Sequence, residues 1–550
     1  MLRQVKAACA AALVLAGAAC CRNTADVVPL PQASSVRCGE YILTADTPVY
    51  AWPESRGMSF AVSEMDALRT MLFGAEGFSE AVFTEESSAG TPCVRMSVDE
   101  SLGRESYRLD ISRRGIEMTG GDPAGLFYAV QTLRQLVPEQ SYRSAGTDGA
   151  KVSLPAVLIS DGPALEYRGI MLDAARHFFP KGDVKRLIDI MALHKMNVFH
   201  WHLTDDQGWR ISIDSHPELT ETGSVRLRTI IGKDPGGEYD ETTRYDETPH
   251  GGYYTKDDIR EIVAYAESKF ITVIPEIEFP GHAVAAIASL PYLGCTGERY
   301  EVRQTWDIDD RVFCLGREST FAFFEDVLAE VAELFPSEYI HLGGDECPTV
   351  MWENCPYCRK RMEEENLGSF RALQGYGMKR LEKYLASLGR SVIGWDEILE
   401  AGVDHSAVVM SWRGRENALR AAENGNRVIM SPTEYSYFDY YQTEDTENEP
   451  LAWGGYIPLY KVFSFDPYDG LDSSVRHFVI GVQANLWTEY IPDFSHAEYM
   501  LLPRLGAMSE VAWRGGTDGD YDGFLGRMRA FSVIYDISGY NCRSAALFED

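Results

Sequence analysis

A repeated order of strand, loop and helix is the feature of this sequence that most limits its fold. From about residue 165 onward, apolar or β-branched stretches alternate with polar loops and, in several cases, with amphipathic helices. The predicted strands cover residues 169–175, 197–203, 271–278, 339–343, 391–395, 407–412, 427–432 and 478–487. Eight strands over roughly 350 residues fit a (β/α)8 barrel. The competing doubly wound sheet is disfavoured, because no GxGxxG motif opens a helix after the first strand.

The stretch NVFHWHL, residues 197–203, indicates how one of these strands lies in the barrel. Side chains alternate between the two faces of a strand, so Phe199 and Trp201 share one face while His200 and His202 share the other. We expect the aromatic face to pack under the surrounding helices and the histidine face to point into the barrel.

Five segments are expected along the chain. They are a signal segment (1–21), a polar linker (22–35), a small non-catalytic α+β domain (36–160), the catalytic barrel (161–516) and a C-terminal helical segment that packs on the barrel (517–550). In the small domain, residues 107–112 and 115–120 predict two strands joined by a turn. Asp122 and Pro123 then predict a helix start, as its N-cap and first residue.

The first residues are typical of an exported protein. Arg3 and Lys6 precede an apolar run rich in small residues, which is too short to span a membrane. The run ends in Cys20 and Cys21 and resembles a bacterial lipoprotein signal, although two alanines separate the Leu-Ala-Gly box from Cys20. We expect export to the periplasm, or attachment to the outer membrane through a lipid on one of these cysteines.

Charge and cysteine content limit the partners of the chain. The formal net charge of −32 disfavours nucleic acid, whose binding requires Lys and Arg against phosphate. A neutral substrate fits better. Cys347, Cys355 and Cys358 lie close together in the sequence, but these three residues with no histidine nearby do not predict a zinc site, and disulfide connectivity is left open.

Reactive side chains follow the carboxyl end of nearly every predicted strand, which is the edge where a β/α barrel builds its active site. They include Asp173, Arg176, Asp205, Asp206, Glu276, Glu278, His282, Asp345, Glu346, Trp395, Trp412, Tyr437, Asp439, Trp487 and Glu489. The tryptophans suit flat apolar walls for a pyranose ring, and the charged groups suit directional hydrogen bonds to its hydroxyls. The sequence therefore predicts acid catalysis on a sugar.

The adjacent acids Asp345 and Glu346 point to one kind of sugar. Most glycosidases place two carboxyl groups about 5 Å or about 6.5–9.5 Å apart across the scissile bond. Neighbouring side chains at a strand end point in different directions, so the carboxyl groups of Asp345 and Glu346 are not expected to lie on opposite sides of a glycosidic bond. A 2-acetamido sugar removes that requirement, because its carbonyl oxygen can attack its own anomeric carbon. The enzyme then supplies one acid and one orienting carboxylate.

Several motifs together resemble the β-N-acetylhexosaminidases of glycoside hydrolase family 20, from about residue 105 to 515. They are YRGIMLDAARHFFP, MALHKMNVFHWHLTDDQGWR, VIPEIEFPGHAVAA, YIHLGGDECP, GWDEIL, MSWRG, YSYFDYYQ and GVQANLWTE. The resemblance implies a retaining exo-enzyme that removes terminal β-linked N-acetylglucosamine, or N-acetylgalactosamine, from the non-reducing end of a glycan. It also implies an oxazolinium-like intermediate and no metal or other cofactor.

The resemblance implies a role for each candidate residue. Glu346 is the general acid, Asp345 holds the acetamido N–H, and Tyr437 bonds the carbonyl oxygen. Asp205 and His282 form a supporting pair that keeps Glu346 protonated, which nearby negative charge and burial favour. The terminal sugar is bound by Arg176, Trp395, Trp412, Asp439, Trp487 and Glu489.

Three alternatives stay open at the level of sequence. A glycosidase of the same family that releases a disaccharide would need a longer pocket. A metal-dependent barrel hydrolase is suggested by the pair His200 and His202, because H-x-H on a barrel strand can bind a metal. A glycan-binding lipoprotein without turnover is the third. The Gly-rich loop 232–252 is expected at the rim of the site.

Overall fold

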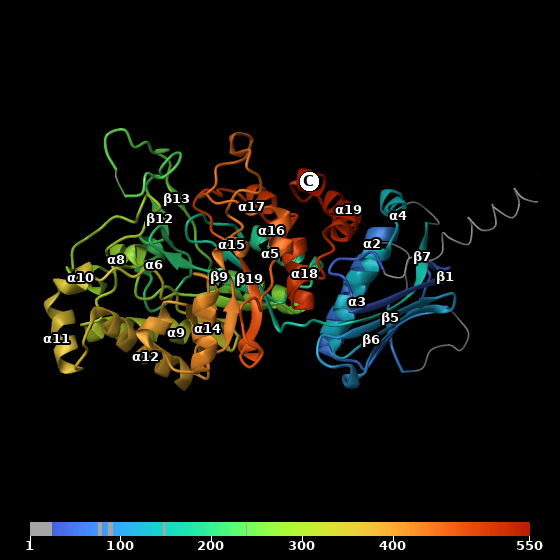
Figure 1. Ribbon diagram of the computed structural model, residues 1–550, viewed down its shortest axis with the longest axis horizontal. Helices are drawn as coiled ribbons and strands as arrows, with labels where there is room; N and C mark the ends of the chain where they lie inside the picture. Colours follow the sequence, from blue (N-terminus) through green and yellow to red (C-terminus); the bar gives the residue numbers. More distant parts are fainter. Residues whose placement is uncertain (1–24, 75–79, 86–91, 147–149, 238, 550) are drawn as a thin grey trace, which may run out of the picture. The chain divides into compact units, whose positions relative to one another are not determined.

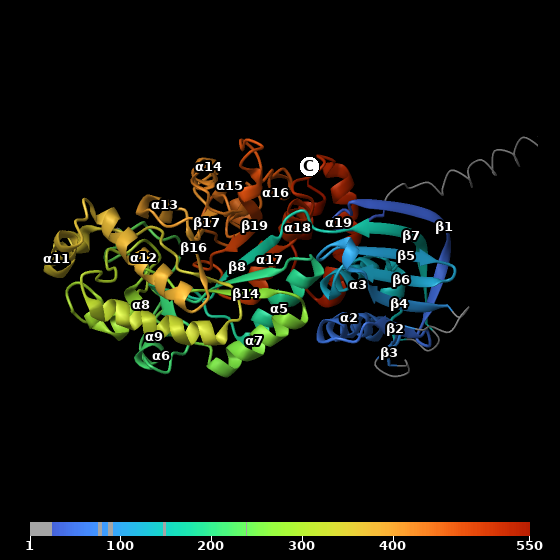
Figure 2. The same cartoon turned by 90° about the horizontal axis from the view of Figure 1, so that it is seen from below.

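The computed structural model describes residues 25–74, 80–85, 92–146, 150–237 and 239–549. The chain forms two compact units (Figures 1 and 2). The first consists of Met1–Ala164 and Asp520–Tyr540, and the second of Leu165–Gly519 and Asn541–Asp550. The expected signal segment, 1–21, lies outside the described residues.

The first unit is a seven-stranded sheet covered by helices. The strands, in their order across the sheet, are β1 (Ala33–Thr44), β7 (Lys151–Asp161), β5 (Tyr107–Ser112), β6 (Gly115–Gly120), β4 (Cys93–Val98), β2 (Val49–Trp52) and β3 (Val82–Phe83). The helices are α2 (Arg56–Phe73), α3 (Pro123–Leu136), α4 (Glu139–Arg143) and α19 (Tyr521–Ser538). Helices α2 and α3 lie side by side, and α3 contacts β4, β5 and β6.

The local signals of this unit are confirmed. Strands β5 and β6 have the bounds that the sequence predicts, and they pair as an antiparallel hairpin. Helix α3 starts after Asp122, whose carboxylate accepts a hydrogen bond from the N–H of Gly125 at 2.9 Å. A side chain that caps the first turn satisfies a backbone donor that has no partner within the helix.

The structure corrects the expectation of a linker at 22–35. Val27 and Val28 are buried, and strand β1 already begins at Ala33. The N–H of Val28 donates to Oε1 of Gln135 at 2.7 Å, and Nε2 of Gln135 donates to the carbonyl of Val28 at 2.6 Å. Two apolar β-branched side chains within a polar stretch thus tie residues 25–35 to the small unit.

The segment 517–550 is not one piece on the barrel either. Helix α19 groups with the first unit and contacts α3, whereas residues 541–550 group with the barrel. The helix buries Phe524, Met528, Phe531 and Tyr535 along one side. The periodic pattern of such a helix predicts a buried face but not which surface covers it.

The second unit is a closed barrel of eight parallel strands, as predicted. In order around the barrel they are β8 (Tyr167–Asp173), β9 (Val198–His202), β14 (Thr272–Glu276), β15 (Tyr339–His341), β16 (Ser391–Trp395), β17 (Val408–Ser411), β18 (Val428–Met430) and β19 (Val479–Leu486). Strand β19 pairs with β8 from Gly481 opposite Tyr167 to Leu486 opposite Leu172, which closes the ring.

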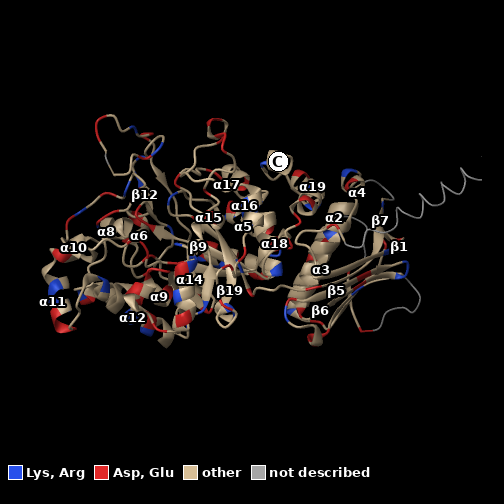
Figure 3. Cartoon of the chain, viewed as in Figure 1, with Lys and Arg blue, Asp and Glu red and all other residues tan. Residues whose placement is uncertain are grey.

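Helices follow the strands around the barrel, and Figure 3 shows that both acidic and basic residues are spread along them. The longer helices are α5 (Lys181–Leu193), α7 (Lys256–Ser268), α9 (Glu318–Leu334), α11 (Pro356–Glu364), α12 (Phe370–Ser387), α14 (Arg415–Asn424), α17 (Phe494–Leu501) and α18 (Arg504–Arg514). The shorter ones are α6 (Glu218–Glu221), α8 (Val284–Ser289), α10 (Val350–Glu353), α13 (Ile398–Ala401), α15 (Thr433–Ser436) and α16 (Leu459–Phe463). A small hairpin joins β10 (Thr204–Asp205) to β11 (Gly208–Trp209), and β12 (Val225–Arg226) pairs antiparallel with β13 (His250–Gly251) across a long loop.

The alternation predicted for 197–203 is confirmed. Trp201 packs outward against Tyr254 and Phe335, with ring centroids 4.4 and 6.5 Å apart. His200 and His202 are fully buried within the barrel. Among the described residues, none of the helices has both the length and the apolar character that crossing a membrane requires.

Candidate active site

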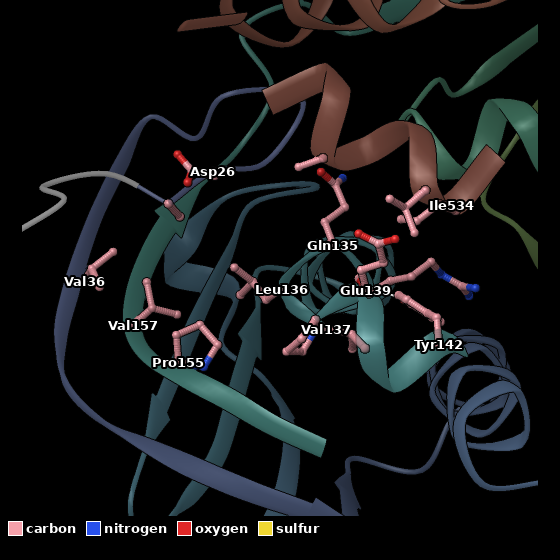
Figure 4. Close-up of a pocket in the computed structure, with 15 residues that line it drawn as sticks. Asp26, Val36, Gln135, Leu136, Val137, Glu139, Tyr142, Pro155, Val157 and Ile534 are labelled. Carbon is pink, nitrogen blue, oxygen red and sulfur yellow. Dashed lines mark hydrogen bonds between the residues drawn. The ribbon is translucent and has the colours of Figure 1, made fainter. Parts of the chain in front are cut away.

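Two cavities differ sharply in their chemistry. One, of about 360 Å³, lies in the first unit and is lined largely by apolar groups such as Val36, Leu136, Val137 and Ile534 (Figure 4). The described residues that line it include the acids Asp26 and Glu139 but no histidine and no tryptophan. The other, of about 190 Å³, opens at the carboxyl end of the barrel strands and is the candidate site.

Every residue that the sequence assigns to catalysis or sugar binding lines the barrel cavity. These are Arg176, Asp205, His282, Asp345, Glu346, Trp395, Trp412, Tyr437, Asp439, Trp487 and Glu489. Their roles remain predictions, but their convergence from the ends of all eight barrel strands is a structural fact. The cavity also includes residues that the sequence analysis missed: Trp306, Asp307, Ile308, Tyr440 and Trp453. Most of these belong to long loops in which no periodic pattern marks an inward-facing position.

The loop 232–252 supports this missed part of the wall. Oδ2 of Asp234 accepts a hydrogen bond from the N–H of Trp306 at 2.9 Å. The ammonium group of Lys233 lies 4.9 Å from the ring centroid of Trp453, within the range of a cation–π contact. The loop therefore contacts two tryptophans of the cavity from behind.

A strained turn carries the acid pair. After β15 ends at His341, Gly343 and Gly344 have φ of +63° and +99°, and Glu346 has φ of +42°. A Cβ atom on Gly343 would lie only 1.8 Å from Oε2 of Glu278, so the two-glycine sequence is required here. The left-handed conformation of a glutamate is costly, and such strain is concentrated at functional sites.

His282 lies between the two acids. Its Nε2 atom is 3.7 Å from Oδ2 of Asp345 and 3.7 Å from Oε2 of Glu346. The side chain of Asp345 is 11% exposed, and that of Glu346 is 36% exposed. Among the described residues, Oδ1 of Asp345 has no hydrogen-bond partner. One acid is thus held deep in the cavity with a free acceptor, and the other reaches toward the opening.

A buried chain of charges supports His282 from below. Nδ1 of His282 lies 3.1 Å from Oδ1 of Asp205, whose Oδ2 lies 2.8 Å from Nη2 of Arg176. Burial alone would lower the pKa of His282, but the charge and hydrogen bond of Asp205 outweigh it and raise the pKa well above its usual value. His282 is therefore a cation at neutral pH.

In the free site the pKa values of the two acids are shifted in opposite directions, and the positive charge of His282 acts on both. Burial raises the pKa of Asp345 to about 7, helped by the charge of Glu346 and opposed by His282. Burial also acts to raise the pKa of Glu346, but the positive charge of His282, 3.7 Å away, outweighs it and lowers that pKa. In the empty site this direction is opposite to the expectation that Asp205 and His282 keep Glu346 protonated, and the expectation stays a prediction for the site with its substrate bound. Asp205 makes His282 a cation, and this cation favours ionised Glu346.

The histidines that suggested a metal surround a carboxylate. Oε1 of Glu276 accepts from Nε1 of Trp395 at 2.9 Å and lies 2.7 Å from Nδ1 of His341. Oε2 of Glu276 is bonded to Nδ1 of His202, whose Nε2 lies 3.0 Å from Oδ2 of Asp205. Hydrogen bonds thus link Glu276 in the barrel core, through His202, to Asp205 and so to His282.

Two more acids line the opposite side of the cavity. Both carboxylate oxygens of Asp439 lack a hydrogen-bond partner among the described residues, and burial together with the charge of Glu489 raises its pKa well above the usual range. Burial also raises the pKa of Glu489 to about 7, against the opposing charge of Arg176. Arg176 lies 5.1 Å from the ring centroid of Trp487. Asp439 thus offers the cavity a carboxyl group with no hydrogen-bond partner among the described residues, and Arg176 offers a cation held by Asp173 and Asp205.

Aromatic rings form the remaining walls. The rings of Trp395 and Trp487 are 5.8 Å apart, and Trp412 stacks on Tyr437 at 6.2 Å. Burial raises the pKa of Tyr437 well above its usual value, which keeps its hydroxyl neutral and able to donate. Nε1 of Trp412 donates to Glu397 at 3.0 Å, which fixes the indole. The cavity can hold a ring of sugar size between flat faces.

Comparison with known families matches both units of the chain. The family model for the glycosyl hydrolase family 20 catalytic domain covers residues 165–516, and the model for glycosyl hydrolase family 20, domain 2, covers residues 24–162. A beta-hexosaminidase of Porphyromonas gingivalis is 42% identical over 83% of this chain, which spans only 57% of that protein's length. A beta-N-acetylhexosaminidase of Cellulomonas fimi is 33% identical over 84% of each chain.

Solved structures resemble the whole chain. An exo beta-N-acetylglucosaminidase of Vibrio harveyi, in complex with N-acetylglucosamine, superposes with a TM-score of 0.80 at 30% identity. The match covers 94% of this chain and 78% of that one. A mutant Streptomyces plicatus beta-hexosaminidase in complex with its product, N-acetylglucosamine, gives a TM-score of 0.79 at 32% identity, over 95% and 97% of the two chains.

Proposed function

The chain belongs to glycosyl hydrolase family 20, and on that premise we propose that it is an exo-acting β-N-acetylhexosaminidase. It hydrolyses terminal, non-reducing β-linked N-acetylglucosamine with retention of configuration. The observation that carries the proposal is the position of Asp345 and Glu346, both 3.7 Å from His282 in a cavity walled by tryptophans. The names of the relatives and the sugar bound in two similar structures support it.

In the first step the substrate supplies its own nucleophile. The carbonyl oxygen of the acetamido group bonds to the anomeric carbon while the bond from that carbon to the glycosidic oxygen breaks. Glu346 gives a proton to the departing oxygen, so the leaving sugar or alcohol is neutral. The buried carboxylate of Asp345 accepts the acetamido N–H and offsets the positive charge of the oxazolinium ion. The hydroxyl of Tyr437 donates to the attacking carbonyl oxygen.

In the second step water opens the oxazolinium ring. Glu346, now ionised, takes a proton from the water as its oxygen bonds to the anomeric carbon. The bond between that carbon and the acetamido oxygen breaks, which restores the amide and the proton on Glu346. Two inversions at one carbon give retention. The protein forms no covalent bond to the sugar.

His282 explains how the acid obtains its proton. In the free site the proton resides on His282, 3.7 Å from Glu346. A bound sugar displaces water from the open side of Glu346, which disfavours its ionised form and moves the proton toward it. Asp205, which faces Nδ1 of His282, then holds the neutral ring in the tautomer that remains after Nε2 has given up its proton.

The base of the cavity favours exo-action over release of a disaccharide. Arg176, Asp439 and Glu489 form a cluster of charged groups beyond the acid pair, with Asp439 almost fully buried. These groups suit the hydroxyls of a terminal ring, and we propose that they end the cavity after one sugar. The metal alternative is disfavoured because both oxygens of Glu276 are already used by Trp395, His341 and His202.

The test of this function compares two aryl glycosides that differ only at carbon 2. We expect hydrolysis of the aryl β-N-acetylglucosaminide and at least a ~10³-fold lower kcat/KM for the aryl β-glucoside, which lacks the internal nucleophile. Equal rates on the two would overturn the proposal. Chitotetraose should give N-acetylglucosamine and the trisaccharide as its first products, and two disaccharides as the first products would favour the alternative.

We also propose that the protein is exported and carries a lipid on Cys20 or Cys21. The support is the sequence alone, since residues 1–24 lie outside the described part of the chain. Labelling of cells with a radioactive fatty acid should mark the protein. Loss of the label in Cys20→Ser or in Cys21→Ser would agree and would identify the modified cysteine, and an unlabelled wild type in the soluble periplasmic fraction would contradict the anchor.

A further inference from the structure

Four cysteines from distant parts of the sequence converge at one point of the barrel unit. Sγ of Cys314 lies 3.7 Å from Sγ of Cys355 and 3.7 Å from Sγ of Cys358, and Sγ of Cys295 lies 3.9 Å from Sγ of Cys358. All four sulfur atoms lie within 4.8 Å of one another. The sequence had grouped Cys347 with Cys355 and Cys358 and predicted no zinc. The structure leaves Cys347 out and brings in Cys295 and Cys314.

We propose that these four residues, the cysteine cluster, bind one structural zinc ion. A tetrahedral ion with metal–sulfur bonds of about 2.3 Å requires sulfur atoms about 3.8 Å apart, and the three distances above agree with that value. Four thiolates with no open position are the donor set of a structural zinc site. Cys314 is equally distant from Cys355 and Cys358, so the geometry singles out no disulfide pair.

Two backbone elements, the start of helix α11 and the end of a backbone bridge, hold three of the four cysteines. Cys355 is the N-cap of helix α11 and Cys358 lies in its first turn, where the helix dipole favours thiolates. Cys314 follows a backbone bridge between Gly294 and Phe313, and its N–H donates to the carbonyl of Leu293 at 2.8 Å. Two short arms thus meet at one point, as in many four-ligand zinc sites.

The close approach of the two arms is built into the chain. A Cβ atom on Gly316 would lie 2.1 Å from the carbonyl carbon of Tyr357 and 2.3 Å from the N atom of Cys358. Nε1 of Trp352 donates to the carbonyl of Phe313 at 2.8 Å, and the indole is fully buried. Cys314, Cys355 and Cys358 are buried as well.

The cysteine cluster connects the segment that follows His282 with the segment that follows Glu346. Cys295 and Cys314 belong to the segment that follows His282, and Cys355 and Cys358 follow Glu346 through α10 (Figure 1). The N–H of Phe313 also donates to the carbonyl of Pro280 at 3.0 Å. Zinc at the cluster therefore fastens the segment of His282 to the loop of Glu346, and holds the proton donor and its partner in register without touching the substrate.

Metal analysis of the full chain tests the proposal. Protein purified without reductant and dialysed against metal-free buffer should contain about one zinc ion per chain. X-ray absorption at the zinc edge should give four sulfur neighbours at about 2.3 Å. Both measurements use the wild type and do not depend on whether a variant folds.

Matched variants assign the ligands. Cys314→Ser and Cys358→Ser should lose the zinc, whereas Cys347→Ser and Cys93→Ser, which replace buried cysteines outside the cluster, should retain it. Removing the zinc from the wild type with a chelator should lower its Tm, and zinc but not magnesium should restore it. This readout is separate from the aryl glycoside assay, so the two proposals fail independently.

Three results would overturn the zinc site. The first is wild-type protein without zinc whose unreduced peptides show Cys314 joined to another cysteine by a disulfide, the form that an oxidising compartment favours. The second is iron in place of zinc in freshly purified protein. The third is zinc that remains at full occupancy in both Cys314→Ser and Cys358→Ser.

Discussion

Replacing Asp345 by Asn should remove activity and yet stabilise the barrel at alkaline pH. Burial raises the pKa of this carboxyl to about 7, compared with about 3.9 in an unfolded chain. A folded-state pKa above the unfolded value contributes stability that is present below pH 3.9 and is lost as the pH rises through 7. At 1.36 kcal/mol per pKa unit, the raised pKa of Asp345 lowers the free energy of unfolding by about 4 kcal/mol at pH 8, where the folded carboxyl is ionised. At pH 5, where the carboxyl must take up a proton on folding, it lowers that free energy by about 1.5 kcal/mol.

The asparagine variant does not titrate, so it avoids this pH-dependent cost. Asp345→Asn should therefore gain about 2–3 kcal/mol more at pH 8 than at pH 5, each relative to the wild type at the same pH. Calorimetry of the barrel transition at the two pH values measures the difference. Asp404→Asn, which replaces an exposed aspartate on the same unit, is the control and should show no such gain.

Activity supplies the second half of this prediction. Loss of the carboxylate that stabilises the oxazolinium ion should lower kcat by about 10²–10³-fold, the range measured for removal of one electrostatic group in a transition state. A variant that keeps its activity, or one that is stabilised equally at pH 5 and pH 8, would refute the reasoning. The first result would remove Asp345 from catalysis, and the second would show that its burial does not raise its pKa.

Three further predictions concern the proton donor and the sugar-binding wall. Glu346→Gln should lower kcat by about 10²–10⁴-fold on an alkyl glycoside but far less on a dinitrophenyl glycoside, whose leaving group needs no proton, and equal losses would contradict its role as acid. His282→Asn removes the group that holds the proton in the free site, so the pKa of the alkaline limb of the kcat/KM profile should fall, and an unmoved limb would contradict the link. Asp439→Asn should raise KM for the aryl N-acetylglucosaminide roughly tenfold or more while Tm at pH 8 rises, and a fall in Tm would show that the carboxylate is paired.

The barrel and its site could be predicted because the signals are local and repeated. Each strand is an apolar run, and the carboxyl ends of parallel strands must meet at one edge, which by itself predicts that Asp205, His282, Glu346 and Trp487 lie close together. The same reasoning failed where contacts are long-range. Nothing near Cys295 in the sequence marks it as a neighbour of Cys358.

The protonation of the site also escaped the sequence. Nearby negative charge and burial were expected to raise the pKa of Glu346, and both are present in the structure. The deciding group is His282, whose positive charge depends on a 3.1 Å contact with Asp205 that no spacing predicts. For the helix at 521–538, the sequence pattern similarly predicts that one face is buried. It does not predict that the helix packs with the first unit.

Hydrolysis of aryl glycosides whose acetamido group carries zero, one, two or three fluorine atoms tests the central claim most directly. Fluorine withdraws electrons from the carbonyl oxygen and leaves the leaving group unchanged. If that oxygen is the nucleophile, log kcat should fall steeply with each fluorine, by several orders of magnitude in total. A flat series, or a glycosyl adduct on a carboxylate of the protein seen by mass spectrometry, would contradict the account.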